Sequence, residues 1–117
     1  MSAPLLDRAV IDDLFDFIGV KAVRPVIELF LSESRELVGR IEQSAADDPA
    51  GREAIRRAAH SLKSGAGQVG AAALSEAAAV VERAAEHAAT DLLATIASLR
   101  ARAAETQGAF ASLLQSK

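Results

Sequence analysis

Residues 49–71 read PAGREAIRRAAHSLKSGAGQVGA, and their apolar side chains recur at the spacing of an amphipathic helix. Asp48 is suited to cap this helix, Pro49 to occupy its first position and Gly70 to form the turn after it. At about 100° per residue, the side chains expected to face the core are Ile55, Ala58, Leu62, Ala66 and Val69. The sequence therefore predicts a helix from Pro49 to about Gly67 with one face open to solvent.

Four further helices are predicted on either side of this segment. They comprise residues 5–18, residues 20–44, a segment that follows Gly70 and ends near His87, and a last segment capped by Thr90. Gly19 separates the first two, and Pro25 requires the second to begin no earlier than about Val20. Because the connections are short, sequential helices should be antiparallel neighbours. The expected fold is all-α: a single domain over residues 1–117, an antiparallel up-down four-helix bundle with a short additional N-terminal helix.

The expected core combines many small side chains with a few large ones. The chain has 27 alanines but only four Phe and no Tyr or Trp, which favours closely packed helices over a β-sheet fold. The large residues expected to contribute most are Phe15, Phe17, Phe30, Leu37, Ile41, Ile55, Leu62, Leu99 and Phe110. Inward positions of the second helix are expected to include Val26, and those of the last helix are Leu93, Ile96, Leu99, Ala103, Phe110 and Leu113.

Composition excludes several classes of function. A net charge of −3 argues against a general nucleic-acid binder, and the absence of cysteine excludes disulfides, thiolate zinc sites and a cysteine nucleophile. No apolar run approaches the roughly 20 residues that span a bilayer, so we expect no membrane segment. The opening residues Met1, Ser2, Ala3 and Pro4 lack the features of a secretory signal, and we therefore expect a cytoplasmic protein.

His60 is predicted to lie on the outward face of the central helix. The residues within about 60° of it are Arg56, Arg57, Lys63, Ser64 and Gly67. An isolated surface histidine is usually only a solvated side chain. Here, however, two glycines follow it, each costing a helix about 1 kcal/mol relative to alanine. Steric access of another protein to the imidazole would explain them, and a close helix contact remains open for Gly65.

Glu82 is a candidate partner of His60. If the turn centres near Gly70, a hairpin of two helices brings residue 82 past residue 60. The carboxylate could then accept a hydrogen bond from the imidazole Nδ1–H and leave Nε2 as the nucleophile. Alternatively, Glu82 could be an exposed glutamate paired with Arg83 or Arg56, and the sequence pattern slightly favours this second arrangement.

Residues 59–71, AHSLKSGAGQVGA, resemble the phosphoacceptor motif of histidine-containing phosphotransfer (HPt) domains. That pattern is roughly A-H-x-L-K-[GS]-small-small-x-x-hydrophobic-G-A. Leu74 and the Val81–Glu82 pair resemble a second, weaker block, and the helical pattern of essentially the whole chain fits the family's bundle. Ser64 stands where many members have glycine, but serine is also small.

This resemblance implies a phosphocarrier of bacterial phosphorelays, with His60 taking a phosphoryl group from an aspartyl phosphate on a receiver domain and passing it to another receiver. Lys63 would offset charge on the phosphoryl group, and Glu82 would orient the imidazole. Expected partners are response-regulator receivers and a hybrid histidine kinase; no cofactor is expected on this chain, because the receiver would supply Mg²⁺, and a monomer is expected. The expected partner-binding residues are Arg56, Ser64, Gly67, Gln68, Leu14, Phe15 and Ile18.

Other functions fit the sequence less well. Gly65, Gly67 and Gly70 match G-x-G-x-x-G, but that fingerprint follows a strand and here an amphipathic helix precedes it, so we expect no autonomous kinase. His60 and His87 lie 27 residues apart without paired-ligand spacing, which argues against a metal site; His87 is expected to be solvated. The alternative function is a non-transferring helical adaptor or inhibitor that binds a receiver or a histidine kinase.

Overall fold

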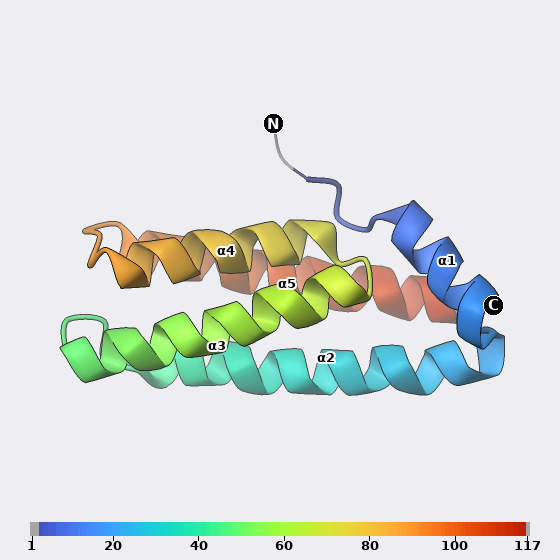
Figure 1. The fold of residues 1–117 in the computed structure, drawn as a ribbon, viewed down its shortest axis with the longest axis horizontal. Coiled ribbons are helices and arrows are strands. Elements are labelled where there is room, and N and C mark those ends of the chain that lie inside the picture. The colour runs from blue at the N-terminus through green and yellow to red at the C-terminus, as the bar shows by residue number, and fades with distance from the viewer. Residues whose placement is uncertain (1–2, 117) are drawn as a thin grey trace.

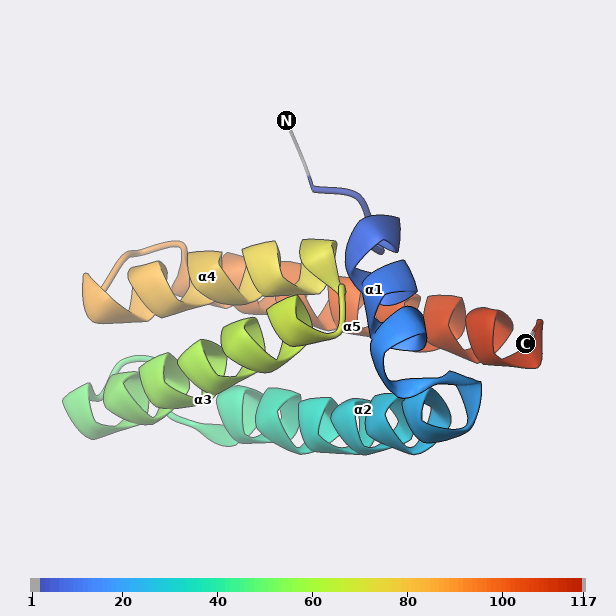
Figure 2. The same ribbon diagram turned by 45° about the vertical axis from the view of Figure 1, so that its right-hand side comes forward.

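A computed structural model of the chain describes residues 3–116, and these residues form helices and connecting turns without any strand. The helices are α1 (Arg8–Ile18), α2 (Val20–Gln43), α3 (Pro49–Gln68), α4 (Ala72–Glu86) and α5 (Leu92–Gln115). Helices α2 to α5 run alternately in opposite directions, and α1 crosses the end of the bundle where α3 turns into α4 (Figures 1 and 2). The predicted all-α bundle with an added N-terminal helix is therefore confirmed. Met1 and Ser2, on which the expectation about secretion partly rests, lie outside the described residues.

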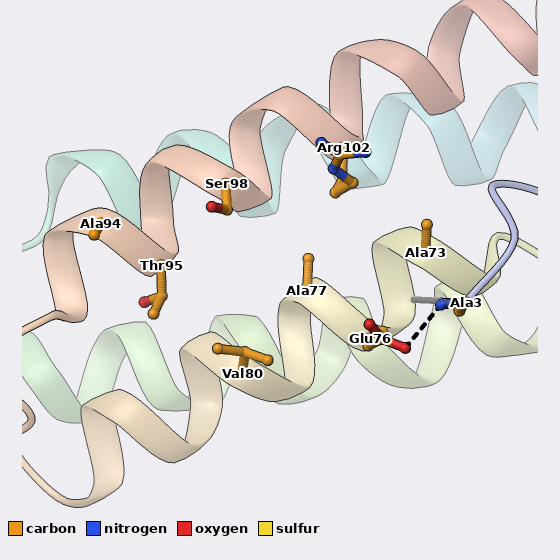
Figure 3. Close-up of a pocket in the computed structure, with 9 residues that line it drawn as sticks. All are labelled: Ala3, Ala73, Glu76, Ala77, Val80, Ala94, Thr95, Ser98 and Arg102. Carbon is orange, nitrogen blue, oxygen red and sulfur yellow. Dashed lines mark hydrogen bonds between the residues drawn. The ribbon is translucent and has the colours of Figure 1, made fainter. Parts of the chain in front are cut away.

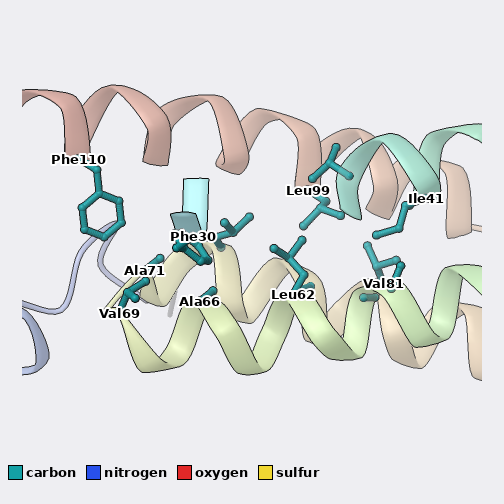
Figure 4. Packing of buried hydrophobic residues seen from close by; sticks show 14 of the residues in the cluster. Phe30, Ile41, Leu62, Ala66, Val69, Ala71, Val81, Leu99 and Phe110 are labelled. Atoms are coloured by element: carbon teal, nitrogen blue, oxygen red, sulfur yellow. The ribbon is translucent and has the colours of Figure 1, made fainter. Parts of the chain in front are cut away.

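The core lies along the bundle axis and receives side chains from all five helices. Figure 4 labels members of this core from α2 to α5. Phe30 of α2 and Phe110 of α5 meet edge to face, with ring centroids 6.2 Å apart. Leu62 of α3 and Leu99 of α5 are fully buried further along the bundle. Burying each such side chain contributes about 1.5–3 kcal/mol, so these large residues anchor the packing of an otherwise alanine-rich interior.

Two large residues expected in the core lie on the surface instead. Phe17 is 90% exposed, because only one face of α1 contacts the bundle and that face is centred on Ile11. Leu93 is 69% exposed, because the buried stripe of α5 begins with Leu92 and continues through Leu99. These two predictions were wrong, because periodicity alone neither shows how wide the buried face of α1 is nor decides between the adjacent Leu92 and Leu93.

Smaller differences concern three other expected core positions and several helix boundaries. Phe15 and Leu37 are half-buried against the core, and Val26 is exposed. Helix α1 begins at Arg8 rather than residue 5, because the Asp7 carboxylate caps it by accepting from the amides of Ala9 and Val10. Thr90 does not cap α5: the N-cap is Asp91, and it makes no side-chain cap hydrogen bond.

Pro25 lies one turn further into α2 than expected. The helix begins at Val20, as predicted, so Pro25 falls in its second turn. Its missing amide leaves the Lys21 carbonyl without its intrahelical partner. Both residues are exposed, and water can satisfy that carbonyl.

The turn between α3 and α4 is a Schellman motif closed by Gly70. The Ala71 amide donates to the Ala66 carbonyl (2.8 Å) and the Gly70 amide to the Gly67 carbonyl (3.4 Å). Gly70 has a φ of +79°, and a Cβ there would lie 2.9 Å from both the Asp7 carbonyl oxygen and Ile11 Cγ1. The Asp7 amide in turn donates to the Gly70 carbonyl (2.7 Å). Glycine is therefore required both by the backbone conformation and by the chain that crosses the turn.

The turn between α4 and α5 has the same hydrogen bonds but no glycine. The Ala89 amide donates to the Ala84 carbonyl (2.9 Å) and the Ala88 amide to the Ala85 carbonyl (3.3 Å). Ala88 occupies the left-handed position with a φ of +51°. An L-residue there costs about 1–2 kcal/mol, so this end of the bundle carries backbone strain that the Gly70 end avoids.

Replacing Gly70 tests the architecture of the α3–α4 turn. We expect Gly70→Ala to lower the free energy of unfolding by about 2 kcal/mol or more, because left-handed strain is added to the contact with Asp7 and Ile11. The matched control is Gly108→Ala in the interior of α5, where a Cβ meets nothing within 4 Å. That change should raise the free energy of unfolding by about 0.5–1 kcal/mol. Urea denaturation measures both, and equal effects of the two substitutions would contradict the assignment.

Candidate functional site

The site is centred on His60, which α3 presents to solvent. The imidazole side chain is 57% exposed, and its Nδ1 lies 2.8 Å from Oε2 of Glu82. The other carboxylate oxygen, Oε1, accepts a hydrogen bond from Nζ of Lys63 at 2.9 Å. A single carboxylate from α4 therefore connects the histidine and the lysine of α3.

The packing of the α3–α4 hairpin sets this geometry. Leu62 and Val81 are fully buried neighbours of the site residues, and they fix the rotation of the two helices about their axes. His60 and Glu82 consequently meet at the seam, where the Glu82 side chain is only 14% exposed. The alternative pairing of Glu82 with Arg56 does not occur, because Arg56 binds Glu53 through two hydrogen bonds of 2.7 and 2.8 Å.

The charge state of Glu82 determines the tautomer of His60. The hydrogen bond from Lys63 lowers the pKa of Glu82, and the hydrogen bond from His60 lowers it further, against an opposing effect of burial. An ionised carboxylate can only accept hydrogen bonds, so Nδ1 must carry the proton. In the neutral ring the Nε2 lone pair is then available for attack, and no residue within 3–116 is hydrogen-bonded to Nε2.

Small or polar residues leave the approach to Nε2 open. Ser64, Gly67 and Gln68 are exposed on the outward side of α3. A Cβ on Gly67 would meet only the Ser75 hydroxyl at 3.7 Å, and one on Gly65 would meet the Phe30 ring at 3.8 Å. Both are ordinary contacts, so helix packing requires neither glycine. Access for a partner remains the explanation for Gly67.

The apolar residues predicted to dock a partner lie apart from His60. Helix α1 crosses the bundle near Gly70, about 15 Å along α3 from His60 at ~1.5 Å per residue. Leu14 is half-buried against the core there, as is Phe15, and Ile18 lies at the α1 end. Sequence analysis did not single out Leu29 of α2, which is 60% exposed. Leu29 falls outside the inward stripe of α2, and this position in the sequence could have identified it as an exposed apolar residue.

Other features of the surface do not contribute to the His60 site. A hollow of about 450 Å³ lies between α4 and α5 (Figure 3). Four of its nine lining residues are alanines, and its Glu76 accepts a hydrogen bond from the Ala3 amide at 3.1 Å. Within residues 3–116, no group of three or more His, Asp or Glu side chains is arranged to hold a metal ion. No helix in the described part of the chain is long and apolar enough to cross a membrane.

Comparison with known proteins agrees with this geometry. The family model of the Hpt domain matches residues 25–113. The chain belongs to the Hpt domain family. Members of this family are phosphocarriers of phosphorelays that interact with receiver domains and histidine kinases, and this Hpt protein has that histidine phosphotransfer role.

The fold is also that of a solved structure. The crystal structure of histidine-containing phosphotransfer protein B (HptB) from Pseudomonas aeruginosa PAO1 superimposes with a TM-score of 0.87, covering 99% of each chain. The two sequences are 24% identical, so this likeness concerns the fold alone. No curated protein matches the sequence.

The lowered pKa of Glu82 predicts a pH dependence of stability. Because this carboxyl ionises more readily in the folded than in the unfolded chain, its contribution is present above its ordinary pKa of 4.5 and is lost as pH falls below that value. Glu82→Gln should therefore lose less stability between pH 6 and about pH 3 than the wild type. Urea unfolding across this range measures the difference. Glu33→Gln, at an exposed position of α2, is the control, and identical pH profiles for wild type and Glu82→Gln would contradict the prediction.

Proposed function

We propose that this Hpt protein carries a phosphoryl group on Nε2 of His60, between the aspartates of two receiver domains or from a hybrid histidine kinase to a response regulator. One observation carries the proposal: an exposed imidazole whose Nδ1 is held 2.8 Å from a largely shielded carboxylate. A solvated surface histidine needs no such partner. A nucleophile does, because the carboxylate fixes the tautomer and orientation of the ring.

The transfer step requires no proton movement on the carrier. The Nε2 lone pair attacks the phosphorus of the aspartyl phosphate, and a nitrogen–phosphorus bond forms. The bond between phosphorus and the aspartate oxygen breaks, and the carboxylate leaves with the electron pair. The proton stays on Nδ1, so the phosphorylated ring becomes cationic, and the Glu82 carboxylate stabilises that charge. Transfer to the next receiver reverses these steps.

Lys63 is the residue that offsets the charge of the phosphoryl group. Its ammonium lies one helical turn from His60 and is shared with Oε1 of Glu82 (2.9 Å). Phosphoryl transfer depends mainly on positioning and charge stabilisation. Lys63 and Glu82 are therefore the only supporting groups that the carrier has to provide, if the receiver supplies Mg²⁺ from its own acidic site. This chain then needs no cofactor of its own.

The receiver approaches over the outward side of α3. Ser64 and Gly67 add little bulk on the turns of α3 that follow His60, and Gln68 is exposed beyond them. Arg56 contributes positive charge one turn earlier while paired with Glu53. Leu14, Phe15 and Ile18 stay predictions for the edge of the interface, at the α1 end. We further propose that the protein acts as a monomer in the cytoplasm and has no kinase activity of its own.

Phosphoryl transfer from a receiver tests the function directly. Receiver domains labelled with ³²P on aspartate are mixed with the protein and Mg²⁺, and acid-labile, base-stable label on the carrier is followed. We expect label on the wild type and on His87→Gln, the matched control at the second histidine, but none on His60→Gln. Receivers that bind the wild type without ever labelling it would instead establish a non-transferring adaptor.

Lys63 can be tested separately from the acceptor itself. We expect Lys63→Met to slow single-turnover transfer by about 10-fold or more, because a cation beside the developing charge is lost. Lys63→Arg should retain most of the rate. Rapid-quench measurements at saturating receiver isolate the chemical step, and an unchanged rate in Lys63→Met would exclude the assigned role.

A further inference from the structure

A groove beside the phosphoacceptor has no role in the transfer chemistry. It lies between α2 and α3, has a volume of about 490 Å³, and is called the α2–α3 groove below. Apolar side chains such as Leu37 and Ala58 line it, and an arginine borders it from each helix, Arg40 from α2 and Arg57 from α3. Its end is lined by Ser61, the residue that follows His60. The groove therefore ends at the residue next to the nucleophile in α3.

The two arginines of the groove present uncommitted hydrogen-bond donors. Arg57 is 73% exposed and gives only its Nε to Glu53, at 3.1 Å. Arg56 differs, since both its Nε and an Nη bind Glu53. Within residues 3–116, no acceptor is hydrogen-bonded to the Arg40 guanidinium. The terminal nitrogens of Arg40 and Arg57 are thus available to carboxylates of another molecule.

The distribution of charge favours an acidic occupant. Helix α3 contains four basic residues and one acidic residue, although the whole chain has 13 basic and 16 acidic residues. The most basic helix of an acidic protein is therefore the one that bears His60. Such a local field steers an oppositely charged surface toward the site and selects its orientation.

The chemistry at His60 fixes where a partner must sit. A receiver that transfers a phosphoryl group has to place phosphorus within bonding reach of Nε2. A standard protein interface covers about 800 Å² per partner, a patch roughly 30 Å across. Arg57 lies three residues from His60, about 4.5 Å along the helix axis at ~1.5 Å per residue. A receiver centred on His60 therefore covers at least the near end of the α2–α3 groove.

We propose that the α2–α3 groove is a recognition surface for the receiver partner, which inserts a segment of apolar residues flanked by acidic side chains. The apolar lining of the groove contacts the apolar residues of that segment, and Arg40 and Arg57 bind its acidic side chains. This inference rests on the proposed function. It adds two specificity-determining residues that act on docking and not on the bond-forming step.

The test separates docking from chemistry. Single-turnover transfer from the receiver that labels the wild type fastest is measured against receiver concentration, for Arg40→Glu, Arg57→Glu and Arg57→Lys. The control is Arg102→Glu, which changes the net charge equally but lies on α5, a helix that packs against α2 and α4. We expect each groove reversal to raise the half-saturating concentration about 10-fold at low salt, with the maximal rate unchanged. Arg57→Lys and Arg102→Glu should stay within twofold of the wild type.

Salt and controls for folding complete the test. Raising salt shortens the screening length from about 10 Å at 0.1 M to about 3 Å at 1 M, so the effect of the reversals should shrink. Circular dichroism and thermal melting verify that the variants fold. The proposal is overturned if the groove reversals match Arg102→Glu, if they lower only the maximal rate, or if light scattering shows that they instead break a dimer. Failure of the proposed function is distinct, since the wild type would then take up no label.

Discussion

The hydrogen bonds that close the turn at Gly70 set the register of α3 against α4, and the site depends on that register. His60 and Glu82 approach each other only because the chain reverses at Gly70 with a fixed rotation of both helices. A shift of one residue would rotate Glu82 by about 100° around α4 and separate it from the imidazole. The crossing of the N-terminal chain over Gly70 holds the same turn from outside.

Glu82 couples two functions through one carboxylate. Each of its oxygens has a different partner, the imidazole and the ammonium group, so both side chains are oriented by the same residue. Neither side chain has to be buried for this, and both stay within reach of a large partner. A protein with little interior volume can thus organise a reactive histidine on an open surface, where a second protein supplies the remaining groups.

Much of the fold was predictable because local signals coincide. Asp48 and Pro49 mark the start of α3 and Gly70 marks the turn after it, and the apolar stripe between them fixes which way His60 faces. Phe17 and Leu93 were wrongly predicted to lie in the core, because a helical wheel drawn for one isolated helix does not show how wide its buried face is. In α1 that width depends on how the helix crosses the bundle, which is a tertiary property.

The candidate site was predictable only in part. The outward position of His60 follows from periodicity. Whether Glu82 pairs with His60 or with Arg56 depends on Glu53, because Arg56 already donates two hydrogen bonds to the Glu53 carboxylate. No spacing in the sequence identifies that competition. The α2–α3 groove could not be found from sequence either, because Arg40 and Arg57 come together only through the packing of two helices. Surfaces shared between helices depend on tertiary packing, which no local sequence pattern specifies.

The left-handed backbone at Ala88 gives the bundle two unequal ends. In the α4–α5 turn, Ala88 has a left-handed conformation that is unfavourable for alanine. In the α3–α4 turn, glycine has the left-handed conformation, and a hydrogen bond from the Asp7 amide holds the turn in addition. Local opening requires least free energy where strain is already stored, so fluctuations of the native bundle should begin at the α4–α5 end. Glu82 lies six residues before Ala88, about 9 Å along α4 at ~1.5 Å per residue, so such fluctuations start closer to the carboxylate that holds His60 than to the turn at Gly70.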